Sequence, residues 1–103
     1  MVEHLSAQHR FTLTVPEGTA VLDYRLHSPH VMEMFHTYTP NAARGRGVAS
    51  QLVKGALDLV RANNFRIIPA CWYVASFMEK HAEYRDLLAG DDGVERPAPS
   101  CEI

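Results

Sequence analysis

The chain has 103 residues and a formal net charge of −2, with 47% hydrophobic and 21% charged residues. This length suits one domain with a single core, and a charge balance without a basic excess disfavours general nucleic-acid binding. The N-terminus has no basic region followed by an apolar run, and no apolar stretch approaches the ~18–20 residues of a membrane span. We therefore expect a cytoplasmic protein that binds neither nucleic acids nor membranes.

Alternation of apolar and polar residues predicts three strands, over residues 10–15, 20–26 and 31–39. The turn PEGT at 16–19 joins the first two as a hairpin, and a second turn at 27–30 leads to the third strand. Three sequential strands with short turns are typical of an antiparallel meander. Strict alternation in the third strand would place Met34 and His36 on one face and Glu33 and Thr37 on the other.

The period changes after Pro40, where apolar residues recur at helical spacing: Val48, Leu52, Val53, Ala56, Leu57 and Val60. We expect this helix over 47–62, ending near Asn63 and Asn64, because asparagine tolerates the left-handed conformation that closes helices. The apolar run 65–71 reads as a buried strand directly after the helix. The third strand, the helix and this strand should then form a right-handed crossover with parallel strands.

A second helix is predicted at about 72–80, followed by one or two more turns. Residues 90–103 are rich in proline, glycine and acids, which predicts a disordered tail beyond a single domain at 1–89. The fold class is therefore α+β. Cys71 and Cys101 show no CxxC pattern, so neither a zinc site nor a disulfide scaffold is indicated, and we expect no bound metal.

The stretch Asn41–Leu52, NAARGRGVASQL, has the composition of an anion-binding helix start. The first N–H groups of a helix lack intrahelical partners, and the aligned peptide dipoles favour negative charge there. Gly45 and Gly47 would let an anion approach the backbone, and Arg44 and Arg46 add positive charge. The alternative is a flexible turn with solvated arginines.

Three phosphate-binding patterns can be compared with this stretch. The Walker form fails because no Gly-Lys-Ser/Thr occurs, and the dinucleotide fingerprint fails at Ser50 and lacks its acidic residue. The sequence from Arg44 to Ala49 fits [RQ]-x-x-G-x-[GA], the acyl-CoA loop of the GNAT N-acetyltransferase superfamily. The pattern lies where a GNAT fold requires it, after a meander and at the start of the crossover helix.

Residues 9–88 resemble minimal, single-domain GNAT N-acetyltransferases of the YjdJ type. The resemblance rests on four segments: HTYTP, RGRGVASQLV, IIPACWYV and FMEKHAEYRDLL. This chain has Trp72 where the family has proline, and Thr39 where the family favours valine. The resemblance implies a GNAT fold, in which an antiparallel meander is followed by a β-α-β crossover and C-terminal helices.

The resemblance also implies acetyl-CoA as cosubstrate. Pantetheine would lie where the two crossover strands splay apart, and pyrophosphate would rest on residues 45–50, with a hydroxyl from Ser50 and loop support from Arg44. The cofactor-binding residues implied in this way are Arg44, Gly45, Arg46, Gly47, Val48, Ala49 and Ser50.

Four residues are candidates for the chemistry, in the order Cys71, His36, Glu33 and Tyr73. Cys71 ends the strand that should face the thioester, so it could protonate the departing thiolate or accept the acetyl group; the alternative is a buried packing cysteine. His36 or Glu33 could relay a proton from the amine, but alternation separates them unless a bulge intervenes. Tyr73 could act as an acid, although packing is the commoner role.

The sequence thus predicts an N-acetyltransferase that transfers acetyl from acetyl-CoA to a primary amine, by direct attack in a ternary complex. The acceptor, a small molecule or a protein lysine or N-terminus, is left open. Two alternatives remain: a non-catalytic CoA- or acyl-CoA-binding module of the same fold, and a small interaction adaptor. We expect a monomer or a weak homodimer paired through an exposed sheet edge.

Overall fold

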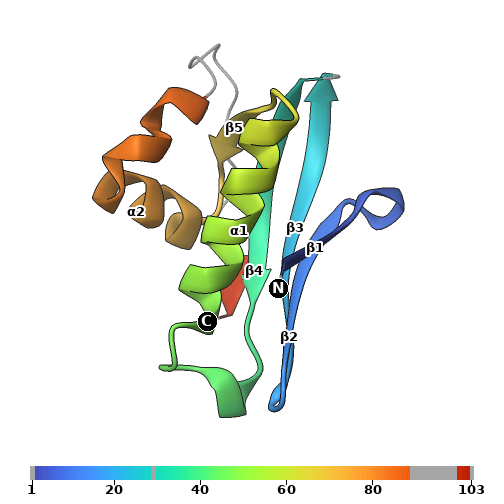
Figure 1. Cartoon of the computed structure of the whole chain (residues 1–103), viewed down its shortest axis with the longest axis vertical. Helices are drawn as coiled ribbons and strands as arrows, with labels where there is room; N and C mark the ends of the chain where they lie inside the picture. The colour runs from blue at the N-terminus through green and yellow to red at the C-terminus, as the bar shows by residue number, and fades with distance from the viewer. Residues whose placement is uncertain (1, 29, 89–99, 103) are drawn as a thin grey trace.

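The computed structural model describes residues 2–28, 30–88 and 100–102. Its strands are β1 (Val2–Leu5), β2 (Arg10–Val15), β3 (Gly18–Ser28), β4 (Val31–Tyr38), β5 (Arg66–Pro69) and β6 (Ser100–Glu102). Its helices are α1 (Val48–Ala62) and α2 (Trp72–Lys80), with the short 3-10 helices η1 (Ser6–Gln8), η2 (Asn41–Ala43) and η3 (Ala82–Leu87). Helix α1 lies across one face of the sheet, and α2 stands beside α1 next to β5 (Figure 1).

The strands follow the order β1-β2-β3-β4-β5. Strands β1 to β4 pair antiparallel with their neighbours, whereas β4 and β5 are parallel. The parallel pair is joined by α1, as a β-α-β crossover requires. The predicted meander, crossover and α+β class are confirmed.

The apolar stripe predicted for α1 is buried at every position. The six buried residues of the helix are Val48, Leu52, Val53, Ala56, Leu57 and Val60. They pack against the apolar face of the sheet, where Phe11, Leu22 and Met34 are at most 1% exposed. Apolar residues that recur with a period of 3.6 can all be buried together only if the segment is a helix with that face against the core. This explains why sequence alone located the buried face of α1.

A bulge in β4 overturns the strict alternation expected there. Tyr24 pairs with Met34, and the next pair is Asp23 with His36, so one extra residue, Phe35, is inserted on the β4 side. Because Thr37 pairs with the buried Leu22, Thr37 lies on the α1 face together with Met34.

The bulge also changes how two candidate residues are placed. His36 pairs with Asp23 and Glu33 pairs with Arg25, and these partners are two positions apart on β3. His36 and Glu33 therefore share the sheet face turned away from α1. The expectation that they face opposite sides is wrong, and the inserted residue is the reason.

Strand β1 was not predicted, because Val2 and Leu5 do not alternate as a strand pattern requires. Its position depends on a glycine in the middle of α1. A Cβ at Gly55 would overlap the side chain of Val2, so glycine at this position lets the strand lie against the helix. The pairing of Val2–Leu5 with Arg10–Leu13 then completes the sheet edge.

The predicted tail, 90–103, lies outside the described residues except for 100–102. Those three residues form β6, which pairs parallel with His36–Tyr38 of β4. In the described part of the chain, no helix has both the length and the apolar character needed to cross a bilayer.

Candidate functional site

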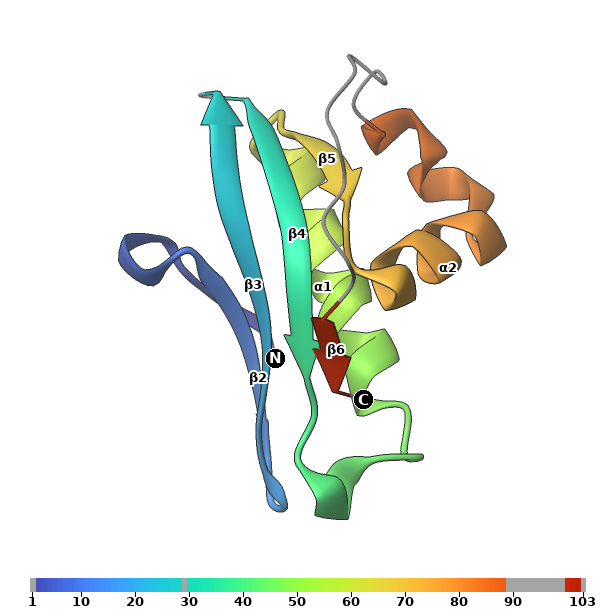
Figure 2. The ribbon, with the colours of Figure 1, turned by 180° about the vertical axis from the view of Figure 1, so that it is seen from behind.

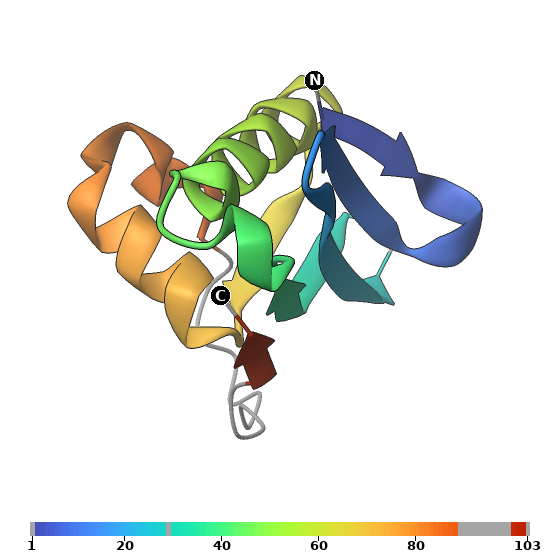
Figure 3. The same ribbon diagram turned by 90° about the horizontal axis from the view of Figure 1, so that it is seen from below.

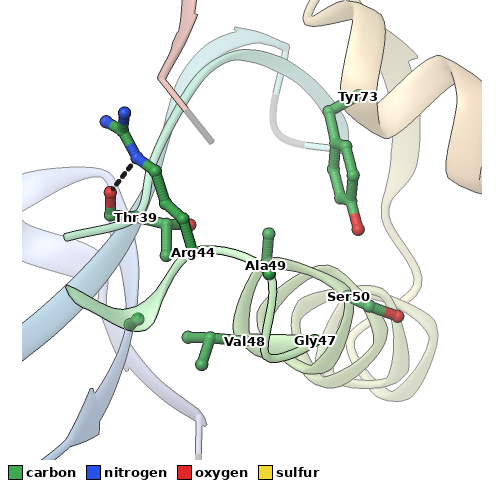
Figure 4. A pocket seen from close by; sticks show the side chains of 9 residues that line it. Thr39, Arg44, Gly47, Val48, Ala49, Ser50 and Tyr73 are labelled. Carbon is green, nitrogen blue, oxygen red and sulfur yellow. Dashed lines mark hydrogen bonds between the residues drawn. The ribbon is translucent and has the colours of Figure 1, made fainter. Parts of the chain in front are cut away.

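The loop between β4 and α1 lines a pocket of about 230 Å³ (Figure 4). Gly45 and Gly47 adopt positive φ angles of 83° and 76°, and Gly47 is the N-cap of α1. A Cβ at either glycine would meet no protein atom within 4 Å, so backbone conformation, and not crowding, requires glycine there. The pocket is lined by Thr39, Ala43, Arg44, Gly45, Gly47, Val48, Ala49, Ser50 and Tyr73.

The start of α1 offers hydrogen-bond donors to this pocket. The first intrahelical bond runs from the N–H of Gln51 to the carbonyl of Gly47 (3.0 Å). No side chain caps the helix, and its first turn carries no acidic residue. In addition, the buried hydroxyl of Thr39 has no hydrogen-bond partner among the described residues. These groups fit an anionic, oxygen-rich ligand such as a pyrophosphate.

The two arginines of the loop have different surroundings. Arg44 donates from Nε to the carbonyl of Thr39 (2.9 Å), which ties the loop back to the end of β4, as the dashed line in Figure 4 shows. Arg46 donates to Glu17 in the β2–β3 turn (2.6 Å) and remains two-thirds exposed. Arg44 is therefore hydrogen-bonded to the residue that follows β4, while Arg46 is paired with a carboxylate.

Tyr73 reaches the same pocket from the other side. Its side chain extends from the first turn of α2 toward the beginning of α1, where Ser50 also lies (Figure 4). The neighbouring Trp72 is 50% exposed and meets the Tyr73 ring edge-on, with 5.8 Å between the ring centroids. The pocket thus places a phenol opposite the donors of the loop.

Cys71 lies at the junction of β5 and α2. Its N–H donates to the carbonyl of Met34 (2.9 Å), which is the last bond between this strand and β4 before the chain turns into α2. Its sulfur is fully buried, 3.3 Å from the hydroxyl of Thr37. Cys71 is disulfide-bonded, and no free cysteine occurs among the residues that the structure describes. The cysteine pattern indicated no disulfide scaffold, and this disulfide was not anticipated, because sequence spacing does not show which residues folding brings together.

His36 lies on the other face of β4 in a small charged cluster. Its Nδ1 is 3.0 Å from Oδ2 of Asp23, and the other oxygen of Asp23 accepts a bond from Nε of Arg10 (2.7 Å). Because the carboxylate can only accept, a neutral His36 must carry its proton on Nδ1. Sequence reasoning missed Asp23. The sequence shows Asp23 as the acidic residue of the predicted strand 20–26. It does not show the bulge in β4, which places Asp23 opposite His36.

Glu33 is buried and not solvated as a strand-edge carboxylate would be. Its residue is 3% exposed, and Oε1 lies 2.6 Å from Nε2 of His27. The second oxygen, Oε2, is buried without a partner among the described residues. In the ranges that the structure describes, no group of three His, Cys, Asp or Glu side chains could hold a metal ion.

The candidates therefore fall into two groups around the end of β4. Cys71 and Tyr73 lie at the β5–α2 junction, with the cysteine sulfur against Thr37 on the α1 face. His36 and Glu33 lie on the opposite face of the same strand. Cys71 and His36 lie near the point where β5 leaves β4, whereas Glu33 lies within the β4–β5 pairing, opposite Ile68. Tyr73 lines the pocket of the glycine loop.

Comparisons with known proteins agree with this architecture. The profile of a family described as GCN5-related N-acetyl-transferase matches residues 10–87. Protein NATD1 from Bos taurus is 35% identical over 82 residues, covering 78% of this chain and 73% of that protein. NATD1 from Danio rerio is 31% identical over 91 residues, covering 84% and 83% respectively. The solution structure of a GCN5-like protein from Staphylococcus aureus superposes with a TM-score of 0.61 at 23% identity, covering 87% of this chain and 88% of that one.

Proposed function

Because this chain belongs to the GCN5-related N-acetyltransferase family, we propose that it transfers an acetyl group from acetyl-CoA to a primary amine. The acceptor is a small amine or a protein lysine or N-terminus, and the amine attacks the thioester directly in a ternary complex. One observation carries the proposal. The glycine loop leads into an uncapped helix start, in a pocket beside the point where β5 leaves β4.

The loop and helix would hold the pyrophosphate of acetyl-CoA. The N–H groups at the start of α1 donate to it, Ser50 adds a hydroxyl, and Arg44 keeps the loop in place through Thr39. The pantetheine arm would extend along the edge of β4 beyond its pairing with β5, toward Cys71. Charge-assisted hydrogen bonds are worth roughly 1.5–3 kcal/mol each, so a few of them suffice to retain a pyrophosphate against water.

His36 is the residue that we assign to proton removal from the amine. An alkylammonium of pKa ~10.4 needs about 4.6 kcal/mol to become neutral at pH 7, so a base or local desolvation must help. Asp23 accepts a hydrogen bond from Nδ1 of His36, so in the neutral imidazole the unprotonated nitrogen is Nε2. Glu33 is the weaker candidate, because one of its oxygens is engaged by His27.

The departing CoA thiolate would take a proton from a side chain on the α1 face of β4, the face opposite His36. Cys71 can supply it only as a thiol, so its disulfide must first be reduced. Tyr73 lines the pocket and is the second possible acid. We rank a mechanism with a covalent acetyl-cysteine intermediate second to direct transfer.

Two measurements test the proposal. Calorimetric titration of the reduced chain with acetyl-CoA should show saturable binding, and release of the CoA thiol with a panel of amines should show turnover. Replacing Cys71 by alanine should lower turnover while binding persists. Absence of binding at high micromolar acetyl-CoA would show that the chain does not use this cofactor. Unchanged turnover in Cys71→Ala would show that Cys71 is not the acid.

The burial of Cys71 favours a second candidate function. If its buried sulfur, packed against Thr37, supplies no proton to the thiolate, the chain would keep the acyl-CoA loop but lack the thiol acid, and it would act as a CoA- or acyl-CoA-binding module. This reading predicts saturable binding with thiol release no faster than in a protein-free control, for the reduced chain as well.

A further inference from the structure

The edge of β4 that faces β5 is shared by two strands placed one after the other. Strand β3 occupies the opposite edge along the whole of β4. On the shared edge, β5 pairs with Val31–Met34, and its last bond is made by Cys71. Beyond that bond, β6 pairs with His36–Tyr38, again parallel (Figure 2). The C-terminal strand thus fills the edge that β5 leaves.

This edge is the one that the proposed function gives to pantetheine. The N–H and C=O groups of a strand edge can serve one extended partner at a time. Because β6 runs parallel to β4, its last residue, Glu102, lies opposite Tyr38, at the end of β4 that leads to the glycine loop. Seen from below, the end of β6 lies close to that loop and to the first turn of α1 (Figure 3).

We propose that residues 100–102 compete with acyl-CoA for the edge of β4, and that a disulfide between Cys71 and Cys101 holds them there. This inference rests on the proposed function, since it assumes that the cofactor uses this edge. It makes the end of β4 a binding site for an extended segment of the same chain, under redox control.

The position of Cys101 supports the pairing. Cys71 is disulfide-bonded, and Cys101 is the only other cysteine in the sequence. Cys101 is paired with Thr37 in the β4–β6 ladder, and the hydroxyl of Thr37 lies 3.3 Å from the sulfur of Cys71. The backbone therefore brings both cysteines to the same residue of β4.

The length of β6 explains why a covalent bond would matter. A strand of three residues makes few ladder bonds, so without a tether it is easily displaced. A disulfide raises the local concentration of the segment at its site and makes it a strong competitor. The oxidised chain should then be closed to the cofactor and the reduced chain open.

A small dithiol can switch the two states. One of its thiolates attacks a sulfur of the protein disulfide, breaking the S–S bond and forming a mixed disulfide. Its second thiolate then attacks that mixed disulfide and becomes part of a cyclic disulfide. The protein gains two electrons and two protons and ends with two thiols, and the dithiol is oxidised.

The test compares binding of acetyl-CoA, which has no free thiol of its own, to four samples. These are the full chain and its Cys101→Ser variant, each with and without dithiol. We expect the oxidised full chain to bind at least about tenfold more weakly than the other three, which should agree with one another. Thiol titration of the oxidised full chain should detect no free thiol.

The possible failures are distinguishable. If the oxidised full chain binds as tightly as Cys101→Ser, the competition is wrong while the proposed function stands. If no sample binds acetyl-CoA, the proposed function is wrong and the competition falls with it. Hydrogen exchange gives a readout without ligand. Those amides of 36–38 that point toward β6, and not toward β3, should exchange faster after reduction, and unchanged rates at these amides would contradict the release of β6.

Discussion

At Gly47 a single residue determines both the shape of the loop and the start of α1. Its φ of 76° lies in the left-handed region, which residues with a Cβ avoid. The space around its would-be Cβ contains no protein atom within 4 Å. A substitution there would therefore strain the backbone and intrude on the pocket without disturbing the core.

Gly47→Ala should separate ligand binding from folding. We expect the free energy of unfolding to fall by about 1–2 kcal/mol, the cost of left-handed backbone for alanine. Acetyl-CoA affinity should fall by more than this strain explains, because the new methyl group faces the ligand. Urea unfolding and calorimetry measure the two quantities. Ser50→Ala is the comparison variant: it removes one proposed hydroxyl donor without straining the backbone, so affinity should fall while the free energy of unfolding stays near that of the parent. Equal affinities for parent and Gly47→Ala would contradict the loop assignment.

Asp23→Asn tests whether the carboxylate orients His36. Asparagine has nearly the same shape but can present an N–H to Nδ1, which removes the preference for the proton on that nitrogen. We expect long-range proton–nitrogen NMR spectra to show a changed tautomer at His36, and turnover to fall by up to about 10²-fold. Arg10→Gln, which touches the other oxygen of Asp23, should leave the tautomer unchanged. A normal tautomer in Asp23→Asn would rule out the positioning role.

At the scale of elements, a helix or strand could be predicted from the sequence where its own repeating pattern of apolar residues determines its structure. The α1 stripe and the β2–β3 hairpin follow regular periods and were located correctly. The bulge at Phe35 leaves no trace in a strand that is apolar on most positions, and β1 is positioned by its contact with Gly55. Such features come from tertiary contacts, so the glycine loop could be found from sequence whereas the Asp23–His36 pair could not.

Strand β1 is held to the sheet by a cluster that should respond to pH. Nε2 of His4 lies 2.6 Å from the hydroxyl of Tyr24, and the His4 ring stacks on Phe11 with 4.3 Å between centroids. Burial, and secondarily the charge of His9, lower the pKa of His4 from its usual 6.5. The folded state therefore resists protonation of His4, and this contribution to stability is complete above about pH 6.5 and is lost as the pH falls below it.

His4→Gln should flatten this dependence. Between about pH 8 and pH 5.5 the parent should lose more unfolding free energy than the variant, as urea titrations at each pH would show. His9→Gln should give an intermediate slope, because it removes only the smaller of the two causes. Parallel curves for the parent and His4→Gln would show that the cluster does not sense pH in this range.

At the scale of the whole molecule, one core joins the sheet to both helices. The buried cluster includes residues of β2, β3, β4, α1, β5 and α2, so the described part of the chain should unfold as one unit. Leu57 on α1 is fully buried in it. The helix whose first turn forms the pocket is thus fixed by the same contacts that hold the fold together.

Leu57→Ala should lower the free energy of unfolding by about 2–5 kcal/mol, the usual loss for a leucine that leaves a cavity. Far-ultraviolet circular dichroism reports the sheet and helices, and fluorescence of Trp72 reports the start of α2. Both should give the same transition in parent and variant. A separate fluorescence transition would mean that α2 unfolds independently of the core.

The direction of β6 has a practical consequence for making the protein. A purification tag fused after Ile103 would begin one residue beyond Glu102, which lies opposite Tyr38 and near the glycine loop. At the other end of the chain, Val2 lies over the middle of α1, away from the first turn of that helix. Samples for ligand binding are therefore better prepared with an N-terminal tag, and a C-terminal tag would itself obstruct the pocket under study.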